Sequence, residues 1–352
     1  MTAPPPPPTK PRLSRRRRLL FALVPVAALL LGAEVVMRLV RAPLHFGSFR
    51  EFRLDLMRRN YPAERDPVLG YVPRANFAST DNHWGTRVSI DADGLRRNGD
   101  GPRPRGEAVG TAGGDSFTSG DAGDDAAAGP AELERELGRP VKNGGVFGYS
   151  FTQAVLRGEA LVERFPTSDL VVSFIAGDIE RCEYSKRYTP VPWFDLQDGA
   201  LVRQPVPDDA EVTDATAKWW KDLLGHSALV DAVLGNTHRA WWFEDEKQVR
   251  VERLVGRGAE ICRLLVDRIA AFCRARDVRL LLVLQGDRKD DEADAVLAHA
   301  AARGVRTLDL VDRFLAAERQ DPSLRERWFD GHMTRAGNAW VAERIAEVLR
   351  AP

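Results

Sequence analysis

The chain has 352 residues, 44% of them hydrophobic, which is enough for one large domain or two small ones around a sizeable core. Lysine plus arginine and aspartate plus glutamate both number 51, and this balance argues against a nucleic-acid partner. Of the three cysteines, Cys262 and Cys273 lie about 16 Å apart along one predicted helix, too far to bridge. Cys182 has no evident partner. Their spacing predicts no metal site, and no cofactor is expected.

The amino-terminal region pairs a basic cluster with an apolar run. Four arginines, Arg15 to Arg18, precede an apolar segment from Leu19 to Ala33 that continues through Met37 after a single Glu34. A bilayer needs roughly 20 such residues, and basic residues on the amino side keep that side in the cytoplasm. A cleaved signal peptide is the alternative, but Leu31 occupies a position where a cleavage site needs a small residue.

These features predict a single-pass membrane protein with a cytoplasmic amino terminus and an extracytoplasmic (periplasmic or cell-surface) folded domain. The predicted organisation is a disordered basic cytoplasmic tail (1–18), a transmembrane anchor (19–40), a juxtamembrane linker (41–65) and a folded domain (66–352).

Strands and helices alternate from Val109 onwards. Strands are predicted at 87–90, 109–113, 141–143, 169–176, 278–284 and 305–308, and helices at 130–137, 151–165, 251–276, 293–303 and 336–349. Such alternation predicts an α/β fold: a three-layer α/β/α sandwich with a central parallel sheet. The pattern lapses at about 183–250, a proline-rich insertion with two tryptophan pairs. This insertion is either a lid or substrate platform, or a helical subdomain with tryptophans in its core.

Three sequence blocks follow predicted strands or precede the last helix. The first is Gly114-Asp115-Ser116-Phe117-Thr118, the second runs from Asn143 to Gly148, and the third is Asp330-Gly331-His332 followed by Gly337. Reactive groups of open α/β sheets gather just outside the carboxyl ends of the strands, so the fold is expected to bring these blocks together.

The three blocks in this order resemble the SGNH (GDSL-type) serine hydrolases, over roughly Asp66 to the carboxyl terminus. The resemblance implies the flavodoxin-like SGNH hydrolase fold, with Ser116 as nucleophile, His332 as general base and Asp330 orienting the imidazole. It also implies that the backbone N–H groups of Ser116 and Gly148 form the oxyanion hole.

The chain departs from the family pattern at two places. The step from Asp330 to His332 is two residues instead of three, a spacing that occurs in relatives that transfer acetyl groups to polysaccharides. In a further block, which follows the strand predicted at 169–176, the family has asparagine before aspartate, whereas this chain has Gly177 before Asp178. Loss of one oxyanion donor lowers the rate by about 10²–10³. Asn82, Gln153 and Arg181 are possible substitute donors.

The sequence therefore predicts an extracytoplasmic serine esterase acting on an O-acyl ester carried by a lipid, a glycan or a small molecule, with membrane contact through residues 19–40. The alternatives are an O-acyltransferase that modifies a cell-surface polysaccharide and a catalytically inactive binding module. Substrate choice is not readable from the sequence.

Overall fold

The computed structural model describes residues 14–41, 47–53, 63–80, 85–101, 104, 106–113, 116–187, 189–207, 219–243 and 248–351. Residues 1–13 of the predicted tail and much of the predicted linker therefore lie outside the described residues. The last residues of that tail, predicted to be disordered, are helical instead, because α1 begins at Arg15. The chain forms two compact units, one of residues 1–56 and 216–244 and the other of residues 57–215 and 245–352. The first is called the helical unit below, and the second the sheet unit.

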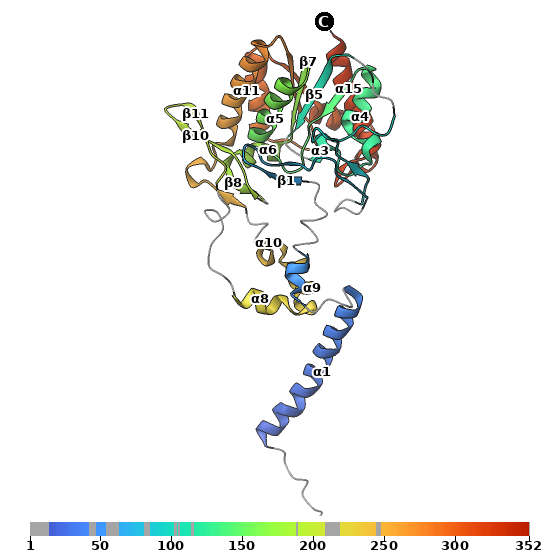
Figure 1. Cartoon of the computed structure of the whole chain (residues 1–352), viewed down its shortest axis with the longest axis vertical. Helices are drawn as coiled ribbons and strands as arrows, with labels where there is room; N and C mark the ends of the chain where they lie inside the picture. Colours follow the sequence, from blue (N-terminus) through green and yellow to red (C-terminus); the bar gives the residue numbers. More distant parts are fainter. Residues whose placement is uncertain are drawn as a thin grey trace, which may run out of the picture. The chain divides into compact units, whose positions relative to one another are not determined.

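A five-stranded parallel sheet is the centre of the sheet unit (Figure 1). Its strands are β5 (Ala108–Gly113), β6 (Val141–Asn143), β7 (Thr167–Phe174), β13 (Arg279–Leu284) and β14 (Arg306–Asp309). They lie in the order β14-β13-β7-β5-β6, and every neighbouring pair is parallel. The chain therefore runs from β5 outwards to β6, then returns to the other side of β5 at β7. This reversal is the topological switch point where open α/β sheets bind ligands.

Alternating side chains of the central strands enter two separate hydrophobic clusters. Leu170, Val172 and Phe174 of β7 pack on one face, with α5 (Phe151–Arg164), α11 (Gly258–Arg274) and α12 (Asp291–Ala302). Val171 packs on the other face, with α4 (Gly129–Leu137) and α15 (Arg335–Arg350). A strand buried on both faces reads as a continuous apolar run, as this one does. The predicted three-layer α/β/α sandwich with a parallel sheet is confirmed.

The ends of the flanking helices follow from local sequence. Ser150 and Gln153 form a capping box at the start of α5, in which the Ser150 hydroxyl accepts the Gln153 amide at 3.3 Å and Gln153 Oε1 accepts the Ser150 amide at 3.1 Å. Gly138 ends α4 in the left-handed conformation, at φ 62°. These caps set the first residue of α5 and the last residue of α4.

The predicted insertion contains strands as well as helices. Strands β8 (Tyr184–Arg187), β9 (Thr189–Pro190), β10 (Trp193–Gln197), β11 (Ala200–Gln204) and β12 (Val249–Arg250) belong to the sheet unit. Helices α8 (Trp219–Gly225), α9 (Ala228–Thr237) and α10 (Arg239–Trp242) belong to the helical unit. The tryptophans of this segment are not uniformly core residues, because Trp242 is buried and Trp219 is exposed.

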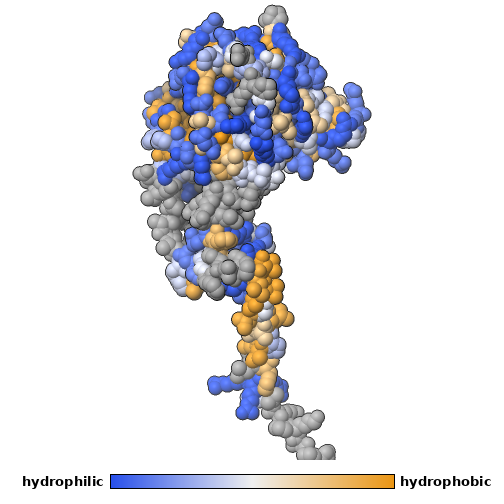
Figure 2. All heavy atoms as spheres, turned by 45° about the vertical axis from the view of Figure 1, so that its right-hand side comes forward, coloured by the Kyte–Doolittle hydropathy of each residue, from blue (hydrophilic) through white to orange (hydrophobic). Residues whose placement is uncertain are grey.

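The helical unit contains α1 (Arg15–Arg41), which is long and apolar enough to cross a membrane. Its apolar side chains are exposed over most of its length, as Figure 2 shows. Within this unit α1 packs against α9. The association joins segments almost 200 residues apart in the sequence.

Candidate active site

Ser116 lies directly beyond the carboxyl end of β5, at the switch point of the sheet. It begins the short helix α3 (Ser116–Ser119), and its side chain is partly exposed. Gly114 and Asp115, which complete the first block, lie outside the described residues. The hydroxyl-bearing residue is thus at the position where this fold presents reactive groups.

The glycines of the second block allow its loop to lie against α3. A Cβ added at Gly145 would be 2.6 Å from the Ser119 nitrogen and 2.7 Å from the Thr118 carbonyl carbon, closer than atoms of this size approach. Asn143 secures the contact, because its Oδ1 accepts the Gly145 amide at 3.2 Å and its Nδ2 donates to the Ser119 carbonyl at 3.4 Å. Only glycine at position 145 permits this approach.

Gly148 ends the same loop in a conformation that favours glycine. Its φ is 69°, and the peptide group that carries its N–H is held by the Tyr71 hydroxyl, which donates to the Phe147 carbonyl oxygen at 2.7 Å. Within the described part of the chain, the Gly148 N–H has no hydrogen-bond acceptor. An amide held in a fixed orientation and left without an acceptor is suited to an oxyanion.

Gly177 and Asp178 lie beyond β7, in α6 (Ala176–Glu180). The buried Asp178 is structural: its Oδ2 accepts the Ile175 amide at 3.1 Å, and its Oδ1 pairs with Arg181. A Cβ added at Gly177 would have Arg181 Nη2 and Ile175 Cδ1 as its nearest neighbours, both at 3.9 Å. The site therefore has space for a side chain where the family pattern has asparagine.

Two of the three possible substitute donors are among the described residues, and these two differ in their hydrogen-bond partners. Gln153 is buried and donates from Nε2 to the Leu69 carbonyl at 2.7 Å, so its amide serves the fold. Asn82 lies outside the described residues. Arg181 has the position nearest to Gly177, and its Nη1 also donates to the Tyr149 carbonyl at 3.1 Å.

Asp330 and His332 face each other across a tight hairpin. Strand β15 (Phe329–Asp330) pairs antiparallel with β16 (His332–Met333), with Asp330 directly opposite His332. Gly331 makes the turn at φ 68°. Opposed residues of an antiparallel pair have Cβ atoms about 4.5–5.5 Å apart, so a two-residue step suffices to pair a carboxylate with an imidazole.

The fold brings this hairpin next to the helix that starts at Ser116. The Phe117 ring lies 5.6 Å from the His332 imidazole, centroid to centroid, and 6.4 Å from the Phe329 ring. Ser116 and His332 are therefore carried by neighbouring elements, although more than 200 residues separate them.

Two buried side chains that sequence reasoning missed hold α3 in place. Arg96 pairs with Asp125 at 3.2 Å and donates to the carbonyl oxygens of Ser119 at 2.9 Å and Gly123 at 2.6 Å. Gln285, at the end of β13, donates to the Thr118 hydroxyl at 2.9 Å. Neither residue belongs to a recognisable motif, so the single sequence contains no signal for them.

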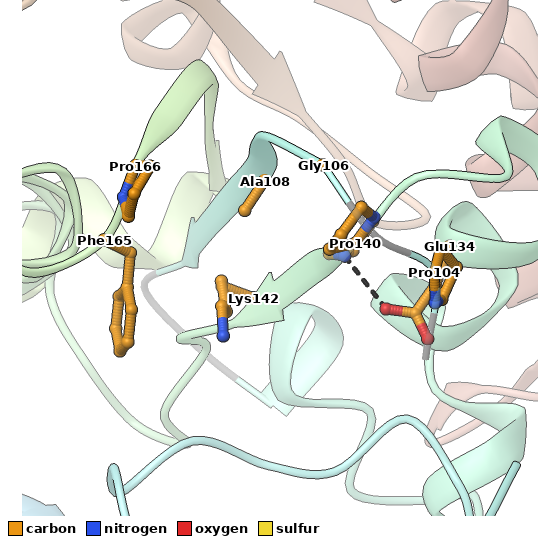
Figure 3. Close-up of a pocket in the computed structure, with 9 residues that line it drawn as sticks. Pro104, Gly106, Ala108, Glu134, Pro140, Lys142, Phe165 and Pro166 are labelled. Atoms are coloured by element: carbon orange, nitrogen blue, oxygen red, sulfur yellow. Dashed lines mark hydrogen bonds between the residues drawn. The ribbon is translucent and has the colours of Figure 1, made fainter. Parts of the chain in front are cut away.

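One hollow lies at the opposite end of the sheet, by the first residues of β5 and β6. It has a volume of about 310 Å³ and is lined by Ala108, Glu134, Lys142, Phe165 and their neighbours (Figure 3). Glu134 Oε2 accepts the Val141 amide there at 2.9 Å. Because ligands of this fold bind at the carboxyl ends of the strands, this hollow is not the candidate active site. The described residues contain no cluster of three or more metal-ligating side chains.

Comparisons with solved structures find weak similarity over much of the chain. The chain is similar over 69% of its length to 99% of a candidate lipolytic protein of the G-D-S-L family from Desulfitobacterium hafniense DCB-2, at 12% identity and a TM-score of 0.35. A second solved structure is similar over 69% of this chain and 96% of its own, at 16% identity and a TM-score of 0.38. No family model and no curated protein matches the chain. Because these identities and TM-scores are low, the fold rests on the chain's own strand order and register.

Proposed function

We propose that the chain is a serine esterase that hydrolyses an O-acyl ester through Ser116, His332 and Asp330. The observation that carries the proposal is the contact between the Phe117 and His332 rings, since it makes the helix of Ser116 and the Asp330–His332 hairpin neighbours at the carboxyl end of the sheet. A serine hydroxyl is a weak nucleophile until a base within hydrogen-bond reach accepts its proton.

In the proposed reaction the Ser116 Oγ attacks the ester carbonyl carbon while the His332 imidazole accepts the hydroxyl proton. The tetrahedral intermediate collapses, the C–O bond to the alcohol breaks, and the imidazolium returns the proton to the departing alkoxide. Water then attacks the acyl-serine by the same route and releases the acid. Asp330, opposite His332, orients the ring and stabilises its charged form.

The oxyanion of both intermediates would be bound by the backbone N–H groups of Ser116 and Gly148. The support for Gly148 is the fixed orientation of the peptide group that carries its N–H, held by the Tyr71 hydroxyl at the Phe147 carbonyl. Gly177 offers no side-chain donor, so the proposed enzyme is slow unless the neighbouring Arg181 supplies one.

Hydrolysis of p-nitrophenyl acetate by the purified full chain tests the proposal. Ser116→Ala and His332→Ala are each expected to lower kcat by about 10⁴–10⁶, the loss typical of triad residues. Ser119→Ala, in the same short helix, is a control for damage to α3. Full activity in Ser116→Ala would contradict the proposal.

An O-acyltransferase is the second candidate, favoured by the direct opposition of Asp330 and His332 at the short spacing found in polysaccharide-modifying relatives. It would use the same acyl-serine, with a sugar hydroxyl in place of water. Acyl transfer to an oligosaccharide faster than hydrolysis, when both acceptors are present, would select this function.

We also propose that α1 anchors the chain in a membrane, with Arg15 to Arg18 in the cytoplasm and the sheet unit outside it. The support is the length and hydropathy of α1 and the basic residues at its start. Protease added outside intact cells or spheroplasts should degrade the sheet unit. Complete protection, with degradation only after lysis, would refute this orientation.

A further inference from the structure

The helical unit has charged side chains in its interior. Asp231 of α9 is fully buried, and its carboxylate accepts hydrogen bonds from Arg41 Nη1 at 3.0 Å, Arg53 Nη1 at 3.2 Å and Trp242 Nε1 at 2.8 Å. Buried charges require such partners, because an unpaired one is strongly destabilising. These bonds join α1, the segment after it, α9 and α10 into one body.

Glu34 of α1 holds the amino-terminal end of α9 by hydrogen bonds. Its carboxylate accepts hydrogen bonds from the Ser227 hydroxyl at 2.7 Å and from the Ala228 and Leu229 amides, both at 3.0 Å. Arg38 donates to the same carboxylate at 2.7 Å. The first turn of α9 is therefore capped by a residue of the apolar helix.

The outer surface of the helical unit carries large apolar side chains beside polar ones such as Asp222. In α8, Trp219 is 71% exposed and Leu223, one turn further on, is 64% exposed. Lys221 on the inner side is only 2% exposed, with its ammonium 4.5 Å above the Trp241 ring. In α9, Val233 is exposed while Asp231 is buried. Helices on the surface of a soluble domain place these residue types the other way round.

The length of α1 places this surface at the edge of a bilayer. At 1.5 Å per residue, the distance along the helix from Arg18 is about 24 Å to Glu34 and about 33 Å to Val40, compared with a hydrocarbon thickness of about 30 Å. Val36 and Val40, beyond Glu34, remain exposed. The α9 cap at Glu34 therefore lies about 6 Å short of the far boundary of the hydrocarbon layer, and Val40 lies about 3 Å beyond that boundary.

We propose that α8 and α9 lie in the extracytoplasmic headgroup region of the bilayer that α1 crosses, with their exposed apolar side chains directed at lipid. The inference rests on the proposed membrane anchor. Four of the eight tryptophans of the chain lie between positions 219 and 242, and tryptophan is enriched at membrane–water interfaces. Buried ion pairs with apolar exteriors are also the arrangement that charged residues adopt at membrane depth.

The test uses the full chain in vesicles of phosphatidylethanolamine and phosphatidylglycerol. Single cysteines introduced by Leu29→Cys, Leu223→Cys and Val255→Cys are labelled with an environment-sensitive fluorophore and exposed to lipids with a nitroxide on the acyl chain. The three native cysteines are buried, and the unsubstituted chain measures their background labelling. Val255 is the matched control, since it is an exposed apolar residue of the sheet unit.

Loss of most of the fluorescence at positions 29 and 223, with little loss at 255, is the expected result. Quenching at position 29 without quenching at position 223 would show that α8 does not contact lipid although α1 crosses the membrane, and would overturn the proposal. No quenching at position 29 would contradict the membrane anchor, and with it the proposed lipid contact of α8 and α9. Disulfide formation between two chains through Leu223→Cys, without lipid quenching, would assign the surface to a second copy and also overturn the proposal.

Discussion

Gly177→Asn tests whether the candidate site lacks a catalytic donor. The substitution restores the asparagine that the family pattern places before Asp178. At Gly177 a new Cβ meets its nearest atoms at 3.9 Å, which is ordinary van der Waals contact, and the backbone is helical. Asparagine has a somewhat higher helix propensity than glycine, so no loss of stability is expected.

The expected gain follows from the worth of one oxyanion donor, about 3–4 kcal/mol, or a factor of about 10²–10³ in kcat. The assay is hydrolysis of p-nitrophenyl acetate, with the thermal midpoint measured alongside. Gly177→Ala is the matched control, because it adds the same Cβ without an amide. If the folded Asn variant is no faster than the Ala variant, the reasoning fails. Loss of activity in Arg181→Gln would then identify the arginine as the donor already present.

Three further predictions concern the support of the site and the thiols. Gly145→Ala forces a Cβ against the backbone of α3. We expect the unfolding free energy to fall by about 1–3 kcal/mol and the proposed esterase activity to be lost. Wild-type stability in urea would contradict the close approach. Arg96→Met leaves its buried carboxylate partner unpaired, a loss of about 3–5 kcal/mol, whereas an unchanged denaturation midpoint would show that the pair is dispensable. Cys182 Sγ lies 3.6 Å from Cys262 Sγ, which corrects the expectation that Cys182 has no partner. In an oxidising compartment the two thiols are expected to give two electrons and two protons to a disulfide oxidant and form a bond. Intact mass and thiol titration of the unfolded chain should then find one free thiol, Cys273. In the native chain burial raises the pKa of Cys273 to about 12, so this thiol stays protonated and resists alkylation at pH 8. Three free thiols in unfolded protein from its native compartment would contradict the disulfide.

The central sheet was readable from sequence because its strands are buried on both faces. The runs that became β7 and β13 are continuous apolar segments, and the predicted bounds differ from the observed ones by only one or two residues at most ends. The predicted helix over 251–276 is shorter in the structure, where α11 begins at Gly258 after a 3₁₀ turn. The segment before α11 lacks a helical cap signal.

The predicted insertion was not readable, for two physical reasons. Strands such as β9 are short, polar and interrupted by prolines, so they lack the alternation that predicts a strand. The helical unit depends on pairs far apart in the chain, such as Glu34 with Ser227, and a single sequence contains no record of such contacts. The same applies to Arg96, whose role depends entirely on the carbonyl groups that the fold places around it.

Covalent labelling by a fluorophosphonate probe shows whether Ser116 is an activated nucleophile, because the reagent modifies only an activated serine. We expect a single labelled peptide containing Ser116 in the folded full chain. The label should disappear in Ser116→Ala and fall sharply in His332→Ala. A folded chain in which Ser116 stays unlabelled, or is labelled equally well without His332, would contradict the proposed triad.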